Sequence, residues 1–149
     1  IIGIWRKNQI AFEIAYLLGV TGGLQAMLTP DMTDFDNWIA YNTFYMHHGL
    51  IILCSFWSIF VDGLRPRRIA LQRTFLFLIF MSIPVGIICW ITGGNYMYLR
   101  EVPNVNNPLV FGEWPWYIIN LAFIGIIMMI IAYLPFYINN KRKMIYDIS

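Results

Sequence analysis

Four apolar stretches of membrane-spanning length constrain this chain more than any other feature. They cover residues 9–28, 38–61, 74–91 and 116–138. An α-helix rises about 1.5 Å per residue, so roughly 20 apolar residues cross the hydrocarbon core of a bilayer. The sequence therefore predicts an all-α fold, a polytopic membrane helix bundle with four transmembrane helices in this chain, within a single domain over residues 1–149.

The composition agrees with a membrane protein. Hydrophobic residues make up 59% of the chain and charged residues 12%, whereas a soluble domain is about 25% charged. This excludes a soluble globular domain, a disordered chain and a disulfide scaffold. The net charge of +2 is too small to indicate a nucleic-acid partner. Because the chain is so apolar, membrane lipids are the expected partners. Cys54 and Cys89 lie within apolar stretches and are predicted to be small buried hydrophobic residues.

The charges outside the spans predict the orientation. Segments rich in Lys and Arg face the cytoplasm. Nine of the ten Lys and Arg residues lie before the first span, around the second connection or after the fourth span: Arg6, Lys7, Arg65, Arg67, Arg68, Arg73, Lys141, Arg142 and Lys143. Only Arg100 lies in a segment assigned to the other side. We therefore expect four crossings in the cell (plasma) membrane, with both ends of this chain in the cytoplasm.

Three ionisable residues lie inside the spans. His47 and His48 stand near the middle of the second span, and residues at such depth face the bundle interior or a wet cavity. Each histidine either makes a structural hydrogen bond between helices or is a functional residue of a site. Adjacent helical residues point about 100° apart, so one of the two at most faces a given site. Glu13, near the start of the first span, is expected to snorkel or to pair with Arg6 or an arginine of the second connection.

Five polar or aromatic residues in and around the outer segments are candidate substrate-binding residues: Gln25, Asp31, Asn95, Tyr96 and Arg100. Arg100 is expected either to pair with a nearby acidic or amide group or to hold a phosphate or carboxylate head group. Residues 92–115 carry too much apolar surface for a free loop and are predicted to fold back over the bundle. No soluble-enzyme motif and no metal-ligand spacing is present, so we predict neither a metal nor a cofactor.

Four separated motifs carry a resemblance to a known family. They read TGGLQAMLTPD at 21–31, FYMHHG at 44–49, GNYMYLR at 94–100 and WPWYI at 114–118. In this order, over roughly residues 15–138, they resemble the YwaF-type integral membrane proteins of bacteria. The resemblance implies a six-helix protein in which two helices precede this part. More distantly, the family is similar to a eukaryotic transmembrane acyltransferase that acts on ether phospholipids, and to androgen-induced membrane hydrolases.

The resemblance also implies a mechanism. In these relatives a Cys or Thr nucleophile on an early helix works with a histidine on a later one. The histidine corresponds to His48, with His47 as the alternative, and the nucleophile's helix lies upstream of Ile1. The implied function is a lipid acyltransferase or lipid ester hydrolase. A non-catalytic scaffold that associates with other membrane subunits is the main alternative. A small-solute transporter is a further one, although polar pathway residues are few.

Overall fold

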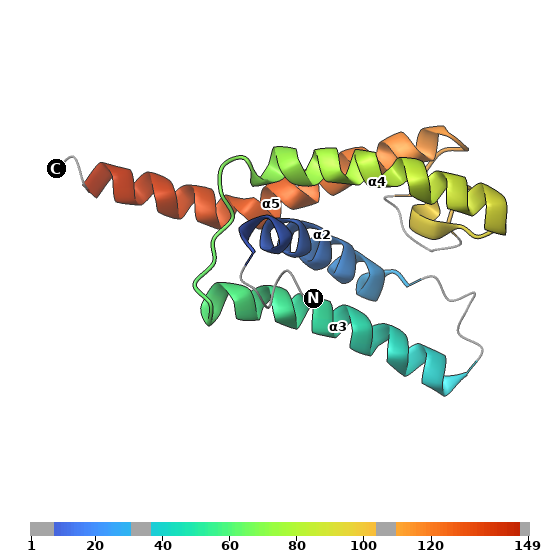
Figure 1. The fold of residues 1–149 in the computed structure, drawn as a ribbon, viewed down its shortest axis with the longest axis horizontal. Helices are drawn as coiled ribbons and strands as arrows, with labels where there is room; N and C mark the ends of the chain where they lie inside the picture. Colours follow the sequence, from blue (N-terminus) through green and yellow to red (C-terminus); the bar gives the residue numbers. More distant parts are fainter. Residues whose placement is uncertain (1–7, 31–36, 104–109, 147–149) are drawn as a thin grey trace.

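Four long helices make up most of the chain (Figure 1). The computed structural model describes residues 8–30, 37–103 and 110–146, and no strand occurs among them. The elements are α2 (Gln9–Leu28), α3 (Trp38–Phe60), α4 (Ala70–Thr92), the short 3₁₀ helix η1 (Tyr96–Tyr98) and α5 (Trp116–Tyr146). The four α-helices are each long and apolar enough to cross a membrane. The all-α, four-span prediction is confirmed, and α4 begins slightly earlier than its predicted span.

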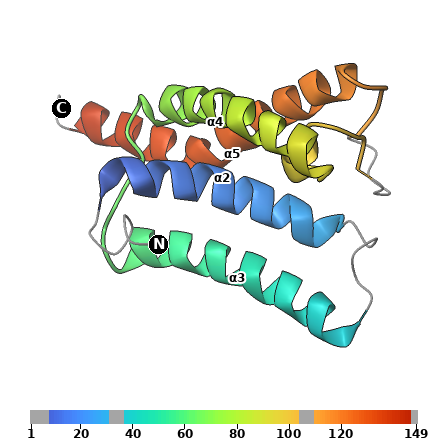
Figure 2. The ribbon, with the colours of Figure 1, turned by 45° about the vertical axis from the view of Figure 1, so that its right-hand side comes forward.

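Helix α2 is the centre of the bundle. It contacts α3, α4 and α5, and Figures 1 and 2 show it between α3 on one side and the α4–α5 pair on the other. Its polar residues explain this position, because a carboxylate and several small polar groups are costly against lipid. The main apolar cluster joins α2 to the other helices and consists of Phe12, Tyr16, Leu17, Val20, Ile59, Ala70, Met129 and Tyr133.

The two cysteines differ in their burial. Cys89 is buried, as predicted, whereas Cys54 is exposed on α3, so that part of the prediction is wrong. The reason is the arrangement of the helices. Helix α3 packs chiefly on α2, which leaves most of its surface outside the bundle. In a membrane protein a residue within an apolar stretch need not be buried, because lipid solvates the outer face of the helix.

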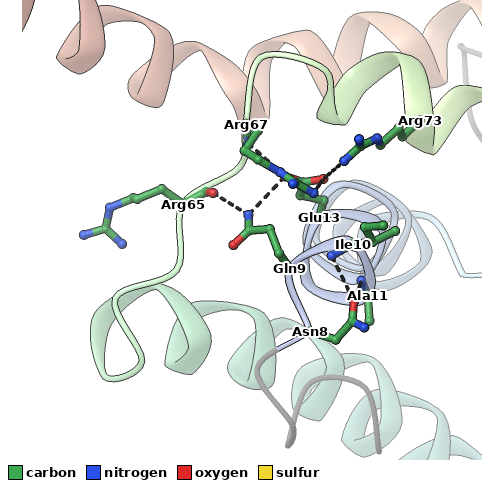
Figure 3. A network of polar contacts seen from close by, with 8 residues as sticks. All are labelled: Asn8, Gln9, Ile10, Ala11, Glu13, Arg65, Arg67 and Arg73. Atoms are coloured by element: carbon green, nitrogen blue, oxygen red, sulfur yellow. Dashed lines mark hydrogen bonds and ion pairs between the residues drawn. The ribbon is translucent and has the colours of Figure 1, made fainter.

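A buried carboxylate connects the start of α2 to the α3–α4 loop, residues 61–69 (Figure 3). The Glu13 side chain has an exposed fraction of 0%. Its Oε1 accepts hydrogen bonds from Gln9 Nε2 at 3.0 Å, the Arg67 amide at 3.0 Å and Arg67 Nε at 2.7 Å. Its Oε2 accepts from Arg67 Nη2 at 3.1 Å and lies 3.7 Å from Arg73 Nη1. The expected pairing of Glu13 with an arginine of this connection is confirmed.

This contact has an electrostatic consequence for the loop. The Arg67 guanidinium donates hydrogen bonds to the Glu13 carboxylate, and these bonds raise the pKa of Arg67. The Gln9 amide also donates to the Arg65 carbonyl at 2.7 Å. The loop is therefore held by both a charged pair and a neutral hydrogen bond, which fixes where α4 begins relative to α2.

A glycine permits the close approach of α2 and α3. A Cβ atom at Gly19 would lie 2.7 Å from Ile51 Cγ2, whereas a Cβ at Gly22 would have no atom within 4 Å. We expect Gly19→Ala to lower the free energy of unfolding by about 1–3 kcal/mol through overpacking. Gly22→Ala, on the same helix, should be neutral or stabilising because alanine favours helix. Unfolding of both variants in mixed detergent micelles measures the difference, and equal stability would contradict the assigned packing.

Candidate active site

A cavity of about 320 Å³ lies between the C-terminal half of α2 and the N-terminal half of α3. It is bounded further by α5 and by the α4–α5 segment, residues 93–115. Its lining residues are Gly22, Gln25, Ala26, Thr29, Phe44, His48, Tyr98, Pro103, Val110 and Leu121. Ligand sites are typically apolar hollows of about 300–1,000 Å³ with a few polar groups that orient the ligand. This cavity has that size and character.

His48 is held in one orientation by its own helix. Its Nδ1 lies 2.8 Å from the Phe44 carbonyl oxygen. The centroids of the His48 and Phe44 rings lie 4.3 Å apart. A carbonyl oxygen only accepts hydrogen bonds, so Nδ1 carries the hydrogen in this contact. The neutral imidazole then keeps its lone pair on Nε2, the form that accepts a proton. His48 is half-buried on the cavity, whereas His47 is exposed.

Gln25 and Gly22 form the α2 wall of the cavity. Gln25 Nε2 donates to Thr29 Oγ1 at 3.1 Å, and Thr29 Oγ1 donates to the Gln25 carbonyl at 3.1 Å. An amide nitrogen has two N–H donors, so the second can bind an oxygen of a ligand. Gly22 presents bare backbone, since a Cβ there would meet open space. This wall combines one oriented donor with room for a ligand.

The α4–α5 segment folds back over the bundle, as predicted for its described residues. Residues 104–109 of this segment lie outside the described part. Met97 and Tyr98 take left-handed φ values of 54° and 52°, which reverse the chain at η1. Tyr117 Oη donates to the Tyr98 carbonyl at 2.6 Å and Trp114 Nε1 to the Leu99 carbonyl at 3.3 Å. Tyr98 therefore reaches the cavity that contains His48.

Asn95 and Arg100 hold this segment together. Asn95 Oδ1 accepts from the amides of Arg100 at 3.1 Å and Glu101 at 3.0 Å, and its Nδ2 donates to the Glu101 carbonyl at 2.8 Å. Arg100 Nε lies 3.4 Å from Glu101 Oε1, and Nη1 donates to the Gly93 carbonyl at the end of α4. Arg100 thus has the acidic partner that was expected, and these contacts stabilise the loop.

The structure brings two of the predicted site residues together, His48 and Gln25. Asn95, Tyr96 and Arg100 belong to the loop around η1 and do not line this cavity. Asp31 lies outside the described residues. The loop residue that lines the cavity is Tyr98, which has a left-handed φ value. The binding roles of all five residues stay predictions.

Several lining residues were not singled out from the sequence. Ala26 and Thr29 follow Gly22 and Gln25 at helical spacing, and Phe44 precedes His48 by one turn, so periodicity could have found them. Tyr98, Pro103, Val110 and Leu121 gave no such signal, because only the tertiary fold brings them to the cavity. Among the described residues, no group of three His, Cys, Asp or Glu side chains could hold a metal ion.

The four long apolar helices define a multi-pass helical membrane protein. The chain belongs to the TMEM164 family, whose model matches residues 1–133. That range includes all of α2, α3 and α4, the α4–α5 segment and the first half of α5. The family shown by this match is TMEM164, and the match does not show membership of the YwaF-type proteins. No curated protein matches the chain, and no solved structure does.

Proposed function

We propose that this protein is a membrane-embedded lipid acyltransferase or lipid ester hydrolase in which His48 is the general base. The observation that carries the proposal is the hydrogen bond from His48 Nδ1 to the Phe44 carbonyl, at the wall of a ligand-sized cavity. Membership of the TMEM164 family supports it, as does the resemblance to ether-lipid acyltransferases. The motifs at residues 21–31 and 44–49 support a place among the YwaF-type bacterial members.

In the proposed reaction, a Cys or Thr nucleophile from a helix upstream of this chain attacks the ester carbonyl carbon of a phospholipid. His48 Nε2 takes the proton from the nucleophile. The ester C–O bond then breaks, and the same proton passes to the oxygen of the leaving lysolipid. A hydroxyl group of a second lysolipid, or water, then attacks the carbonyl carbon of the acyl-enzyme and gives its proton to His48 Nε2. The bond between the acyl group and the Cys or Thr side chain breaks, and the proton returns to that side chain, giving acyl transfer or hydrolysis. The free N–H of Gln25 would bind the carbonyl oxygen as negative charge develops on it.

Lipid analysis of a strain that lacks the gene tests the proposal. Compared with the same strain complemented by the full-length gene, we expect a changed acyl-chain composition of one phospholipid class. Complementation should restore the original composition. Identical lipid profiles in the deleted and complemented strains would contradict an enzyme and favour the scaffold.

We further propose that both ends of this chain are cytoplasmic in the plasma membrane, with membrane lipids and the upstream helices as partners. The partition of Lys and Arg supports this topology. Arg68 in the α3–α4 loop and Glu113 in the α4–α5 segment are both exposed. A membrane-impermeant maleimide added to intact cells should label Glu113→Cys and not Arg68→Cys. Labelling of both positions from one side would overturn the topology.

A further inference from the structure

A second hollow, of about 480 Å³, lies along the seam of α2 and α3. We call it the seam groove. It is lined by Ile14, Ala15, Leu18, Gly19, His47, Leu50, Ile51, Cys54 and Ser55. Its walls are predominantly apolar. The polar atom of Ser55 is already used, because its Oγ donates to the Ile51 carbonyl at 2.9 Å and lies 3.4 Å from the Ala15 carbonyl. The walls therefore match an apolar occupant.

The seam groove continues the His48 cavity along one face of α2. Ile14 and Leu18 line the groove, and Gly22, Gln25 and Thr29 line the cavity. These five residues follow one another in steps of three or four, which is the spacing of a single helix face. Leu18 and Gly22 are separated by about 6 Å along the helix axis, four residues at 1.5 Å each. The two hollows thus lie end to end.

The α3 side shows the same succession. His48 lines the cavity and its neighbour His47 lines the groove. From His47 the groove extends to Ser55, which is about 12 Å along the helix axis at 1.5 Å per residue. The imidazoles therefore mark the junction of the two hollows, and the rest of the groove beyond them is apolar.

We propose that the seam groove binds the acyl chain of the lipid whose ester group lies at His48. The proposal rests on the proposed function and names the place of the substrate's tail. An ester beside the histidines would extend its polar part into the cavity that contains Gln25 and its apolar chain into the groove. Lipid tails are as apolar as the groove, so burial alone gives little affinity. The groove instead orients the chain and thereby positions the ester.

Cys54 offers a test, because it is an exposed groove residue at a distance from His48 along α3. In the full-length protein, Cys54→Trp should fill the groove, and Cys54→Ser should leave it open. Leu53→Trp is the matched control, since Leu53 is 59% exposed on the adjacent helix face. We expect Cys54→Trp to lower the ratio of kcat/KM for hexadecanoyl over butanoyl phospholipid by about tenfold or more. The two other variants should keep the wild-type ratio.

The outcomes separate the two proposals. An unchanged ratio in Cys54→Trp, with both lipids still turned over, overturns the groove assignment alone. If the wild type turns over neither lipid, the proposed function is overturned instead.

A second measurement does not depend on turnover or on the tryptophan variant folding. A phospholipid with a diazirine in its hexadecanoyl chain should label wild-type peptides that contain residues 14–19 or 47–55. Prior alkylation of Cys54 with a bulky maleimide should reduce this labelling. Labelling confined to other helices would mean that a protein helix or no specific ligand fills the groove, and would overturn the proposal.

Discussion

Replacing His48 by alanine in the full-length protein should lower lipid turnover by about 10²–10⁴-fold, the range that a general base contributes. The loss follows from removing Nε2, the nitrogen left to accept a proton when Nδ1 donates to the Phe44 carbonyl. His47→Ala should have a far smaller effect, because His47 is exposed and does not line the cavity. Release and transfer of a labelled acyl chain, with the purified protein in phospholipid vesicles, measure both variants.

Two controls make this result specific to the base. The amount of each variant in the membrane fraction, and its elution as one species in detergent, should match the wild type. His48→Gln keeps a polar side chain of similar reach, whose amide is not a base, and should be as inactive as His48→Ala. If His48→Ala turns over lipid at the wild-type rate, this histidine is a packing residue and the mechanism fails.

The helices were predictable because membrane-spanning length is a local property of the sequence. Residues 9–28 illustrate what is not local. This span contains Glu13, the one carboxylate within the four predicted spans, and α2 is the most buried of the four helices. Its carboxylate and glycines favour the centre of the bundle, where Glu13 and Gly19 find their partners. Hydropathy therefore predicted the helix, whereas its place at the centre of the bundle depends on tertiary contacts that local sequence does not give.

The candidate site was predictable to a smaller extent. Gln25 and His48 meet in one cavity, but helical spacing did not distinguish His48 from His47, and the choice came from the family resemblance. The orientation of α3 on α2 decides which histidine lines the cavity. Tyr98 reaches the same cavity because two consecutive residues take left-handed φ values. A side chain larger than glycine rarely adopts that conformation, so sequence gives no reason to expect it there.

Removing the buried carboxylate should have the largest effect on stability. We expect Glu13→Ala to lower the free energy of unfolding by about 2–4 kcal/mol, because the variant loses several hydrogen bonds to a buried carboxylate and leaves donors unpaired, whereas the half-exposed arginines can turn to water. The variant leaves the Arg67 amide without its acceptor and the Gln9 amide with the Arg65 carbonyl alone, and it leaves Arg73 without its nearby negative charge. Reversible unfolding in mixed detergent micelles, followed by circular dichroism, measures the loss.

A matched carboxylate lies at the other end of the bundle. Glu101 also stands beside an arginine, with Arg100 Nε at 3.4 Å, but its side chain is 67% exposed, against 0% for Glu13. Glu101→Ala should therefore change the free energy of unfolding by no more than about 0.5 kcal/mol. Replacing Glu13 by leucine together with Arg67→Met should recover part of the loss, because the Arg67 guanidinium is then no longer left beside an apolar group and only Arg73 keeps its charge there. If Glu13→Ala proves as stable as Glu101→Ala, the Glu13 contacts do not hold the α3–α4 loop on α2, and apolar packing around Phe12 and Ala70 must fix it instead.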